Sequence, residues 1–485
     1  MISRWLRADR QQPASDCAVA AGGDRPRYRS VPLRQAAVGL LAVGLTAACT
    51  TSPASDPPSP ASTPAAAPEA TVFEDVRIFD GTSSGLSAPS NVLVVGNRIK
   101  KISRQPIDPP PGAVRIAGGG RTLMPGLIDA HAHLYLNTDP KVLLDPSTPP
   151  EILEATALSN GEDALMAGFT TVRDMAGPVF DTKEAFDAGE AVGPRIYPSG
   201  AIVSQTSGHG DFGEPGDLPQ SLGGPQSVAQ ERRLSLIADG RDQVLAATRY
   251  NLRNNASQIK IAAGGGVAST FDPVTVTEYT FDEMRAAVQA AADYGTYVAA
   301  HAYTSKAVRR CIKAGVKSIE HGQLMDEKTL ELVRDNDVWL STQVFEELPE
   351  SFSPLQREKN HEVVVNQSKV WRDAVKNGIK VAWGTDFMFG APLYGPDQNR
   401  ALVKMAEWMT PAAALKVATH DNAQLLALSG SRNPYPGRLG VVAPGAYADL
   451  LLVDGDPTKD LDVIVDPAQN FRVIMKNGII YKDTL

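Results

Sequence analysis

The chain has 485 residues, of which 43% are hydrophobic and 21% are charged, and its net charge is −8. This composition is typical of a soluble globular protein, and the length predicts one large domain with a smaller satellite. No basic stripe interrupts the mildly acidic balance, which excludes nucleic acid as an expected partner.

Residues 1–49 are predicted to be a targeting segment and not part of the fold. Arg27, Arg29 and Arg34 precede the apolar run QAAVGLLAVGLTAAC, which is too short to span a bilayer comfortably. The run ends at Cys49 in a pattern that resembles a bacterial lipoprotein processing site. Ordinary signal cleavage beside a spectator cysteine is the alternative. We expect export to the periplasmic face or the cell surface, with membrane contact through a lipid anchor if Cys49 is processed.

Residues 50–70, TTSPASDPPSPASTPAAAPEA, are predicted to be a tether. The segment has too few apolar residues for a core, and its prolines make it semi-rigid. Beyond it the chain contains one cysteine, Cys311, so no disulfide framework is available there. Stability must therefore come from a large hydrophobic core.

Short runs of alternating apolar and polar residues at both ends of the remaining chain predict antiparallel strands. Turn signals at Asp80-Gly81, Gly96-Asn97 and Gly118 to Gly120 separate the first runs, and DGD and NG turns separate the last ones. Because a different pattern lies between them, residues 71–125 and 438–485 are expected to fold together as a small β-sandwich domain.

Residues 126–437 alternate β-like apolar runs with amphipathic helical stretches, such as TSKAVRRCIKAG, in which Gly315 is expected to be the C-cap. Eight strand–helix repeats over roughly 300 residues predict an α/β fold, a (β/α)8 TIM barrel. A doubly wound sheet is the alternative, disfavoured because no dinucleotide-binding glycine motif follows a first strand. The expected strands are Gly126–His133, Thr170–Asp174, Arg195–Ser199, Ser257–Ile261, Tyr297–His301, Ser318–His321, Val338–Thr342 and Val381–Asp386.

The stretch MPGLIDAHAHLYL contains two histidines, His131 and His133, with one residue between them. Alternate side chains of a strand point to the same side, so both imidazoles would converge at the end of a buried strand. This arrangement offers two nitrogen ligands to a metal ion. A chance spacing in a loop is the alternative.

Four further side chains of the kinds found in metal sites fall at the ends of other expected strands. His301 lies in YVAAHAY, His321 in SIEHG, Asp386 in VAWGTDF, and Lys260 in QIKIAAGGG. Barrel enzymes build their active sites at the carboxyl ends of their strands. The pattern therefore predicts a metal site, whereas the alternative, satisfied core histidines and a surface lysine, does not explain the clustering.

GLIDAHAH, the strand-end lysine, the two later histidines and GTD together resemble the metal-dependent amidohydrolase superfamily, over Val72 to the C-terminus. The resemblance implies a binuclear centre in which Lys260 is N6-carboxylated, since an unmodified ammonium has no lone pair. Nitrogen and oxygen ligands favour Zn²⁺, without excluding Mn²⁺ or Co²⁺. The implied ligands are His131, His133, Lys260 and Asp386 for a buried ion, and Lys260, His301 and His321 for an outer one.

Within this superfamily the expected reaction is hydrolysis of a C–N amide bond, with Asp386 as the catalytic residue that passes a proton from water to the leaving nitrogen. Thr304 in HAYT and the presence of Lys260 disfavour the mononuclear deaminases. TSGHGD, KIAAGGGVAS and HAYT resemble the branch of Xaa-Pro dipeptidases and carboxypeptidases that also holds ochratoxin-degrading amidohydrolases. This likeness implies that His209 and Tyr303 contact the carbonyl or carboxylate of the substrate; a surface loop histidine and a packing tyrosine are the alternatives.

The expected function is therefore release of a C-terminal amino acid from dipeptides, short peptides or N-acyl amino acids, ochratoxin-type amides included. A lactonase, a phosphotriesterase-like enzyme or a cyclic-amide hydrolase is the alternative within the superfamily. A binding or structural lipoprotein on a barrel without catalysis is the other class. A small-molecule or peptide substrate is the expected partner, and pairing into a homo-oligomer is common among barrel enzymes. We expect His361 in a solvated helix, His420 in structural packing and Arg400 on a surface helix.

Overall fold

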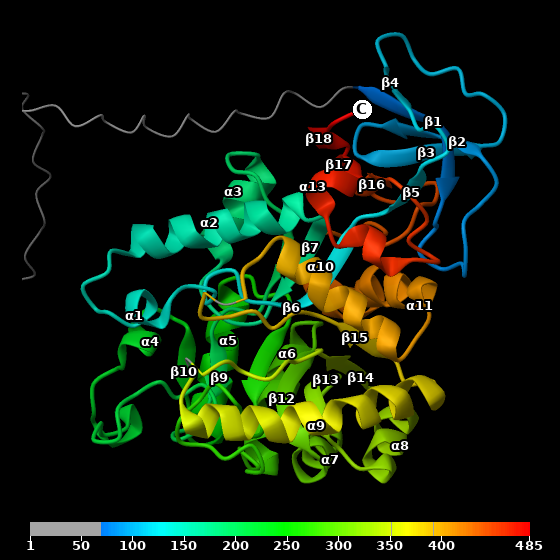
Figure 1. Cartoon of the computed structure of the whole chain (residues 1–485). Helices are drawn as coiled ribbons and strands as arrows, with labels where there is room; N and C mark the ends of the chain where they lie inside the picture. The colour runs from blue at the N-terminus through cyan, green and yellow to red at the C-terminus, as the bar shows by residue number, and fades with distance from the viewer. Residues whose placement is uncertain (1–68, 351, 391) are drawn as a thin grey trace, which may run out of the picture. The chain divides into compact units, whose positions relative to one another are not determined.

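The computed structural model describes residues 69–350, 352–390 and 392–485 (Figure 1). The predicted targeting segment, with Cys49, lies outside these residues. Within the described part of the chain, no helix combines the length and the apolar character needed to span a bilayer.

Both ends of the described chain contribute strands to one eight-stranded sheet. Its members are β1 (Ala70–Ile78), β2 (Ser90–Val95), β3 (Arg98–Ser103), β4 (Val114–Ala117), β5 (Thr122–Pro125), β16 (Leu450–Val453), β17 (Phe471–Lys476) and β18 (Ile479–Asp483). The order is β18-β17-β16-β5-β1-β2-β3, and β4 pairs with β1. The two chain ends meet where β5 pairs antiparallel with β16.

A bulge divides β1 and turns this sheet into two parts around one core. Asp75 has a φ of 52°, and the pairing of β1 with β2 shifts at this point. The second half of β1 also pairs with β5. Phe73, Val94 and Leu452, which come from both parts, belong to the same hydrophobic core. This is the β-sandwich predicted from the two chain ends.

The predicted hairpin turns form as their residues require. Gly96 and Asn97 connect β2 to β3, and Asn477 and Gly478 connect β17 to β18. Asn477 and Gly478 have φ values of 55° and 77°. A two-residue hairpin turn of type I′ needs positive φ at both central positions, which Asn-Gly supplies at low cost.

The middle of the chain forms eight barrel strands, each overlapping one of the expected ones. They are β6 (Leu127–Ala132), β7 (Phe169–Asp174), β8 (Arg195–Pro198), β11 (Ile259–Ala262), β12 (Val298–Thr304), β13 (Ser318–Leu324), β14 (Trp339–Thr342) and β15 (Val381–Trp383). All their pairings are parallel. Two short strands were not predicted from the sequence: β9 (Ile202–Ser204) follows β8 and pairs with β11, and β10 (Ser235–Ile237) pairs with β9.

Backbone hydrogen bonds complete the ring of strands. Ser257 N donates to Pro198 O at 2.7 Å, which links β8 to the start of β11. Asp386 N donates to His131 O at 2.8 Å, which links the end of β15 to β6. The strands therefore form a (β/α)8 barrel, and their carboxyl ends share one rim.

Helices cover the outside of the barrel strands (Figure 1). Thr280 and Glu283 form the capping box that starts α6, and Gly315, at a φ of 98°, ends α7 as predicted. The helices are α1 (Pro140–Leu143), α2 (Pro150–Met166), α3 (Phe180–Ala188), α4 (Val228–Glu231), α5 (Arg241–Arg253), α6 (Phe281–Asp293), α7 (Ser305–Ala314), α8 (Glu327–Asp335), α9 (Pro354–Lys376), α10 (Pro396–Val403), α11 (Pro411–Lys416), α12 (Asn422–Leu426) and α13 (Pro467–Asn470).

Candidate active site

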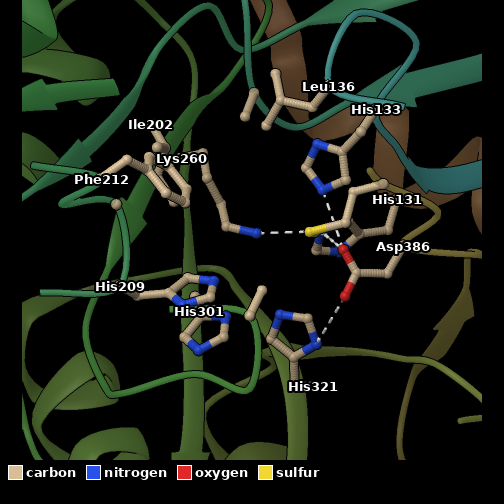
Figure 2. Close-up of a pocket in the computed structure, with 14 residues that line it drawn as sticks. His131, His133, Leu136, Ile202, His209, Phe212, Lys260, His301, His321 and Asp386 are labelled. Carbon is tan, nitrogen blue, oxygen red and sulfur yellow. Dashed lines mark hydrogen bonds and ion pairs between the residues drawn. The ribbon is translucent and has the colours of Figure 1, made fainter. Parts of the chain in front are cut away.

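His131 and His133, at the end of β6, point to the same side, as the strand alternation requires (Figure 2). His131 Nε2 lies 3.2 Å from Lys260 Nζ and 3.3 Å from Asp386 Oδ1. His133 Nε2 lies 3.0 Å from the same Asp386 oxygen. The ligand atoms of His131, His133 and Asp386 all lie within 4.8 Å of one another, which makes this group a candidate metal site.

Asp386 reaches this group because the backbone turns sharply after β15. The strand was expected to continue to Asp386 but ends at Trp383, and Asp386 itself has a φ of 58°, outside the range of a strand. A Cβ atom on Gly384 would lie 2.2 Å from His131 N. The glycine of GTD therefore permits the close approach that places the carboxylate beside the histidines.

Lys260 is buried at the centre of the site, which excludes the surface lysine considered from the sequence. Its side chain comes from β11, and the residue is 2% exposed. Burial lowers the pKa of Lys260 to about 8, an effect that the carboxylates of Glu320 and Asp386 oppose. A lysine with this pKa is partly neutral under mildly alkaline conditions.

His301 and His321, from β12 and β13, line the same cavity. His301 Nε2 donates to Gly265 O at 3.0 Å, and His321 Nδ1 donates to Gln343 Oε1 at 2.7 Å. Within the described ranges, His301 Nδ1 is buried without a hydrogen-bond partner. Burial lowers the pKa of both imidazoles well below the usual value, so both rings are neutral and retain a lone pair.

A buried ion pair between Arg173 and Glu320, which the sequence analysis missed, contacts His131. Glu320 Oε2 lies 2.8 Å from His131 Nδ1 and 2.8 Å from Arg173 Nη2, and all three side chains are buried. A carboxylate on the outer ring nitrogen fixes the orientation of a ligating histidine. The signal was present as charged residues inside apolar strands, in TTVRD and SIEHG.

The two residues expected to contact substrate also lie at the site. The ring of His209 stacks on that of His301, with centroids 3.8 Å apart and planes 17° apart. Burial lowers the pKa of His209 to about 3, and the charge of Lys260 adds to this effect. Tyr303 is buried, and its ring centroid lies 5.1 Å from those of both His301 and His321.

The metal-site cavity adjoins a larger pocket of about 550 Å³, because His209, His301 and Asp386 line both. The larger pocket is mostly apolar, with aromatic side chains from Phe345, Phe352, Phe387 and Phe389. A pocket of this size suits a small molecule or a short peptide.

Arg400, His361 and His420 were expected to have structural roles. Arg400 lies on a surface helix, α10, as expected, but it also lines the larger pocket and pairs with Asp397 at 2.5 Å. His361 is exposed on α9, and His420 pairs with Asp421, and neither histidine lines the two cavities.

These side chains fit divalent metal ions. The imidazoles are neutral, the outer nitrogens of His131, His301 and His321 are engaged, and a buried nitrogen of His301 has no partner among the described residues. Ligating histidines have this arrangement, with one nitrogen held by a protein acceptor and the other free for the ion.

Comparison with known proteins identifies the family. The model of the amidohydrolase family matches residues 122–482. The chain belongs to the amidohydrolase family. The amidohydrolase resembles an ochratoxinase of Aspergillus niger, with 32% identity over 380 residues that cover 74% of this chain and 75% of the relative.

Solved structures agree with this assignment. A prolidase complexed with N-methylphosphonate-L-proline has a TM-score of 0.78 and 32% identity to the amidohydrolase, covering 86% of this chain and 100% of the other. A Xaa-Pro dipeptidase with bound methionine has a TM-score of 0.73 and 28% identity, covering 85% and 100%. The amidohydrolase is a hydrolytic enzyme, and the binding or structural lipoprotein considered from the sequence is disfavoured.

Proposed function

We propose that this amidohydrolase hydrolyses an amide bond and releases a C-terminal amino acid from dipeptides, short peptides or N-acyl amino acids. The observation that carries the proposal is the convergence of all six expected ligand residues on one cavity that adjoins a large pocket. The similarity to a prolidase and a Xaa-Pro dipeptidase supports a peptide-like substrate, and the similarity to an ochratoxinase supports ochratoxin-type amides.

The proposed cofactors are two divalent ions, with Zn²⁺ favoured by the nitrogen and oxygen ligands. We propose that Lys260 is N6-carboxylated and shared between them. Only a neutral amine can attack CO2, and the lowered pKa of Lys260, about 8, supports that reaction. The carbamate product carries oxygen atoms that can act as ligands, which the ammonium form lacks.

When bound, the ions would polarise the amide carbonyl and lower the pKa of a water molecule toward neutrality. Asp386 would take a proton from the attacking water and deliver it to the departing nitrogen. This second transfer matters because an amide nitrogen leaves poorly as an anion. Tyr303 stays protonated, since burial raises its pKa well above the usual value, so its hydroxyl would donate to the carbonyl or carboxylate of the substrate.

The lining of the larger pocket indicates which substrates fit best. Phe345, Phe352, Phe387 and Phe389 offer apolar surface, and burying an apolar group there would add roughly 25 cal/mol per Å² of its surface. We therefore expect amides with a bulky apolar or aromatic group to be better substrates than small ones of the same connectivity.

The test is a release assay on purified enzyme with measured metal content, using N-acyl amino acids, dipeptides and lactones side by side. We expect release of free amino acid, loss of activity after exhaustive chelation and recovery with Zn²⁺. His133→Ala should lose bound metal and activity, whereas His361→Ala, at an exposed histidine outside the site, should retain both. Full activity without metal would refute the mechanism, and turnover of lactones alone would replace the amidase by a lactonase.

A further inference from the structure

The ring of His209 packs against the loop between β11 and α6. A Cβ atom on Gly266 would lie 2.0 Å from His209 Nδ1, so only glycine at this position leaves room for the ring. The same ring stacks on that of His301. His209 is thus held in one place between the loop and a residue of the metal site.

A chain of hydrogen bonds leads from His209 into this loop. His209 Nδ1 lies 2.9 Å from Ser269 Oγ, and Ser269 Oγ donates to Asp272 Oδ2 at 2.7 Å. The same Asp272 oxygen accepts from Gly266 N at 2.6 Å. Ser269 and Asp272 are buried, at 2% and 1% exposure.

Lys359, from α9, holds the backbone of this loop in place. Its buried ammonium donates to the carbonyl oxygens of Gly266, Ser269 and Asp272 at 3.0, 2.8 and 2.7 Å. Burial raises the pKa of Asp272, and the hydrogen bonds from Ser269 and Gly266 and the charge of Lys359 oppose this shift. Oδ2 accepts from Gly266 N, whereas Oδ1 is buried without a partner among the described residues, so Oδ2 is an acceptor whether or not Oδ1 carries a proton.

This arrangement determines the position of the proton on His209. The hydroxyl hydrogen of Ser269 is committed to Asp272, so Ser269 Oγ can only accept from His209, and Nδ1 must carry the proton. In a neutral imidazole the lone pair is then on Nε2. No side chain or carbonyl of the described residues bonds to Nε2, and the His209 ring lines both the metal-site cavity and the larger pocket.

We propose that Ser269 and Asp272 are positioning residues that hold His209 in the Nδ1–H tautomer, so that Nε2 accepts a hydrogen bond from an N–H group of the substrate. This assigns His209 to the nitrogen side of the scissile amide, whereas the resemblance in sequence implied its carbonyl or carboxylate. The substrate contact rests on the proposed amidase function, but the tautomer does not.

The tautomer is tested directly by ¹⁵N NMR of histidine-labelled enzyme loaded with diamagnetic Zn²⁺ and without substrate. Protonated and unprotonated ring nitrogens have well-separated shifts, and a His209→Gln variant identifies the signals. We expect a proton on Nδ1 alone in the unmodified enzyme. A proton on Nε2, or protons on both nitrogens near neutral pH, would overturn the proposal.

Two matched variants separate the proposed role from a general effect on the loop. Ser269→Ala removes the acceptor, so the His209 signals should shift toward a mixture of tautomers. Thr277→Val removes a hydroxyl of the same loop that has no hydrogen-bond partner in the described residues, and it should leave them unchanged. Unchanged His209 signals in Ser269→Ala would overturn the role of Ser269.

The substrate contact is tested by comparing N-benzoyl-phenylalanine with its N-methyl analogue, which lacks the amide N–H. Losing one hydrogen bond corresponds to about a tenfold preference in kcat/KM for the N–H compound. We expect this preference in the unmodified enzyme and its collapse in Ser269→Ala at equal metal content. An equal preference in both enzymes would overturn the contact, whereas hydrolysis of neither compound would refute the amidase function and leave the tautomer standing.

Discussion

In three active-site histidines, a separate hydrogen-bond acceptor determines which ring nitrogen carries the proton. Three different acceptors, the Glu320 carboxylate, the Gly265 carbonyl and the Gln343 amide oxygen, each accept a hydrogen bond from the ring N–H of one histidine. Each ring is thereby left with a single lone pair aimed into the cavity. Lys260 Nζ lies 3.2 Å from His131 Nε2, and its contribution to a metal site depends on the chemistry of its amine.

Lys260→Ala should lose bound metal and activity together, because it removes the proposed carbamate. Residues that only support metal ligands cost about 10–100-fold when mutated, so a ligand should cost at least about 100-fold. Short carboxylic acids should restore part of the activity by replacing the missing oxygen ligands. Metal analysis and the release assay measure both effects, with Lys369→Ala on the exposed face of α9 as control. Full activity in Lys260→Ala would remove the carbamate from the mechanism.

The loop that connects β11 to α6 contains a buried carboxyl group, that of Glu278. Glu278 Oε1 accepts from His209 N at 2.9 Å, while Oε2 is buried without a partner in the described part of the chain. Burial raises the pKa of Glu278 to about 9, and the charge of Asp272 contributes. The folded protein therefore keeps Glu278 protonated at neutral pH, which ties the stability of this loop to pH.

Glu278→Gln should become more stable than the unmodified enzyme as the pH rises. In the unfolded chain the carboxyl has its usual pKa of 4.5, so between pH 4.5 and 9 the folded state holds a proton that unfolding releases. The unfolding free energy of the unmodified enzyme thus falls with pH, by about 3 kcal/mol between pH 4.5 and 7 relative to the variant. The difference should vanish below pH 4.

Urea denaturation at several pH values measures this difference. Glu331→Gln, on the outer helix α8, is the control and should follow the unmodified enzyme at every pH. Parallel stability curves for Glu278→Gln and the unmodified enzyme would show that Glu278 is ionised in the folded state.

The two ends of the described chain pair with each other in the β-sandwich, outside the candidate active site. The pairing of β5 with β16 joins strands more than 300 residues apart in sequence, and Arg195 of β8 reaches Asp449, just before β16, at 3.1 Å. All six proposed metal ligands lie between residues 131 and 386. Cleavage or lipid modification within residues 1–68 should therefore change the location of the enzyme and not its reaction.

Cys49→Ala tests the predicted lipid anchor in a bacterial expression host. The unmodified protein should incorporate labelled palmitate and sediment with membranes. Cys49→Ala should do neither, and its specific activity should stay the same because the site lies far along the chain. Cys311→Ala, at the buried cysteine of α7, should be labelled like the unmodified protein. Absence of label in the unmodified protein would favour ordinary signal cleavage.

Local patterns in the sequence were sufficient for the barrel strands and for the shared direction of His131 and His133. Strand alternation placed His131 and His133 on one side, and polar residues at the ends of apolar runs marked the catalytic rim. The hairpin at Asn477-Gly478 was predictable because its positive φ values are a property of the two residues themselves. These features depend on neighbours within a few positions.

Contacts between distant segments were decided only by the three-dimensional packing. Glu320 and His131 are 189 positions apart, and Ser269 and His209 are 60 apart, so no local pattern pairs them. The same holds for Arg400, which a surface-helix pattern described correctly without revealing the pocket that it lines. A buried charge or a fixed tautomer depends on which partner the fold brings within hydrogen-bond distance, and periodicity along one segment carries no information about that partner.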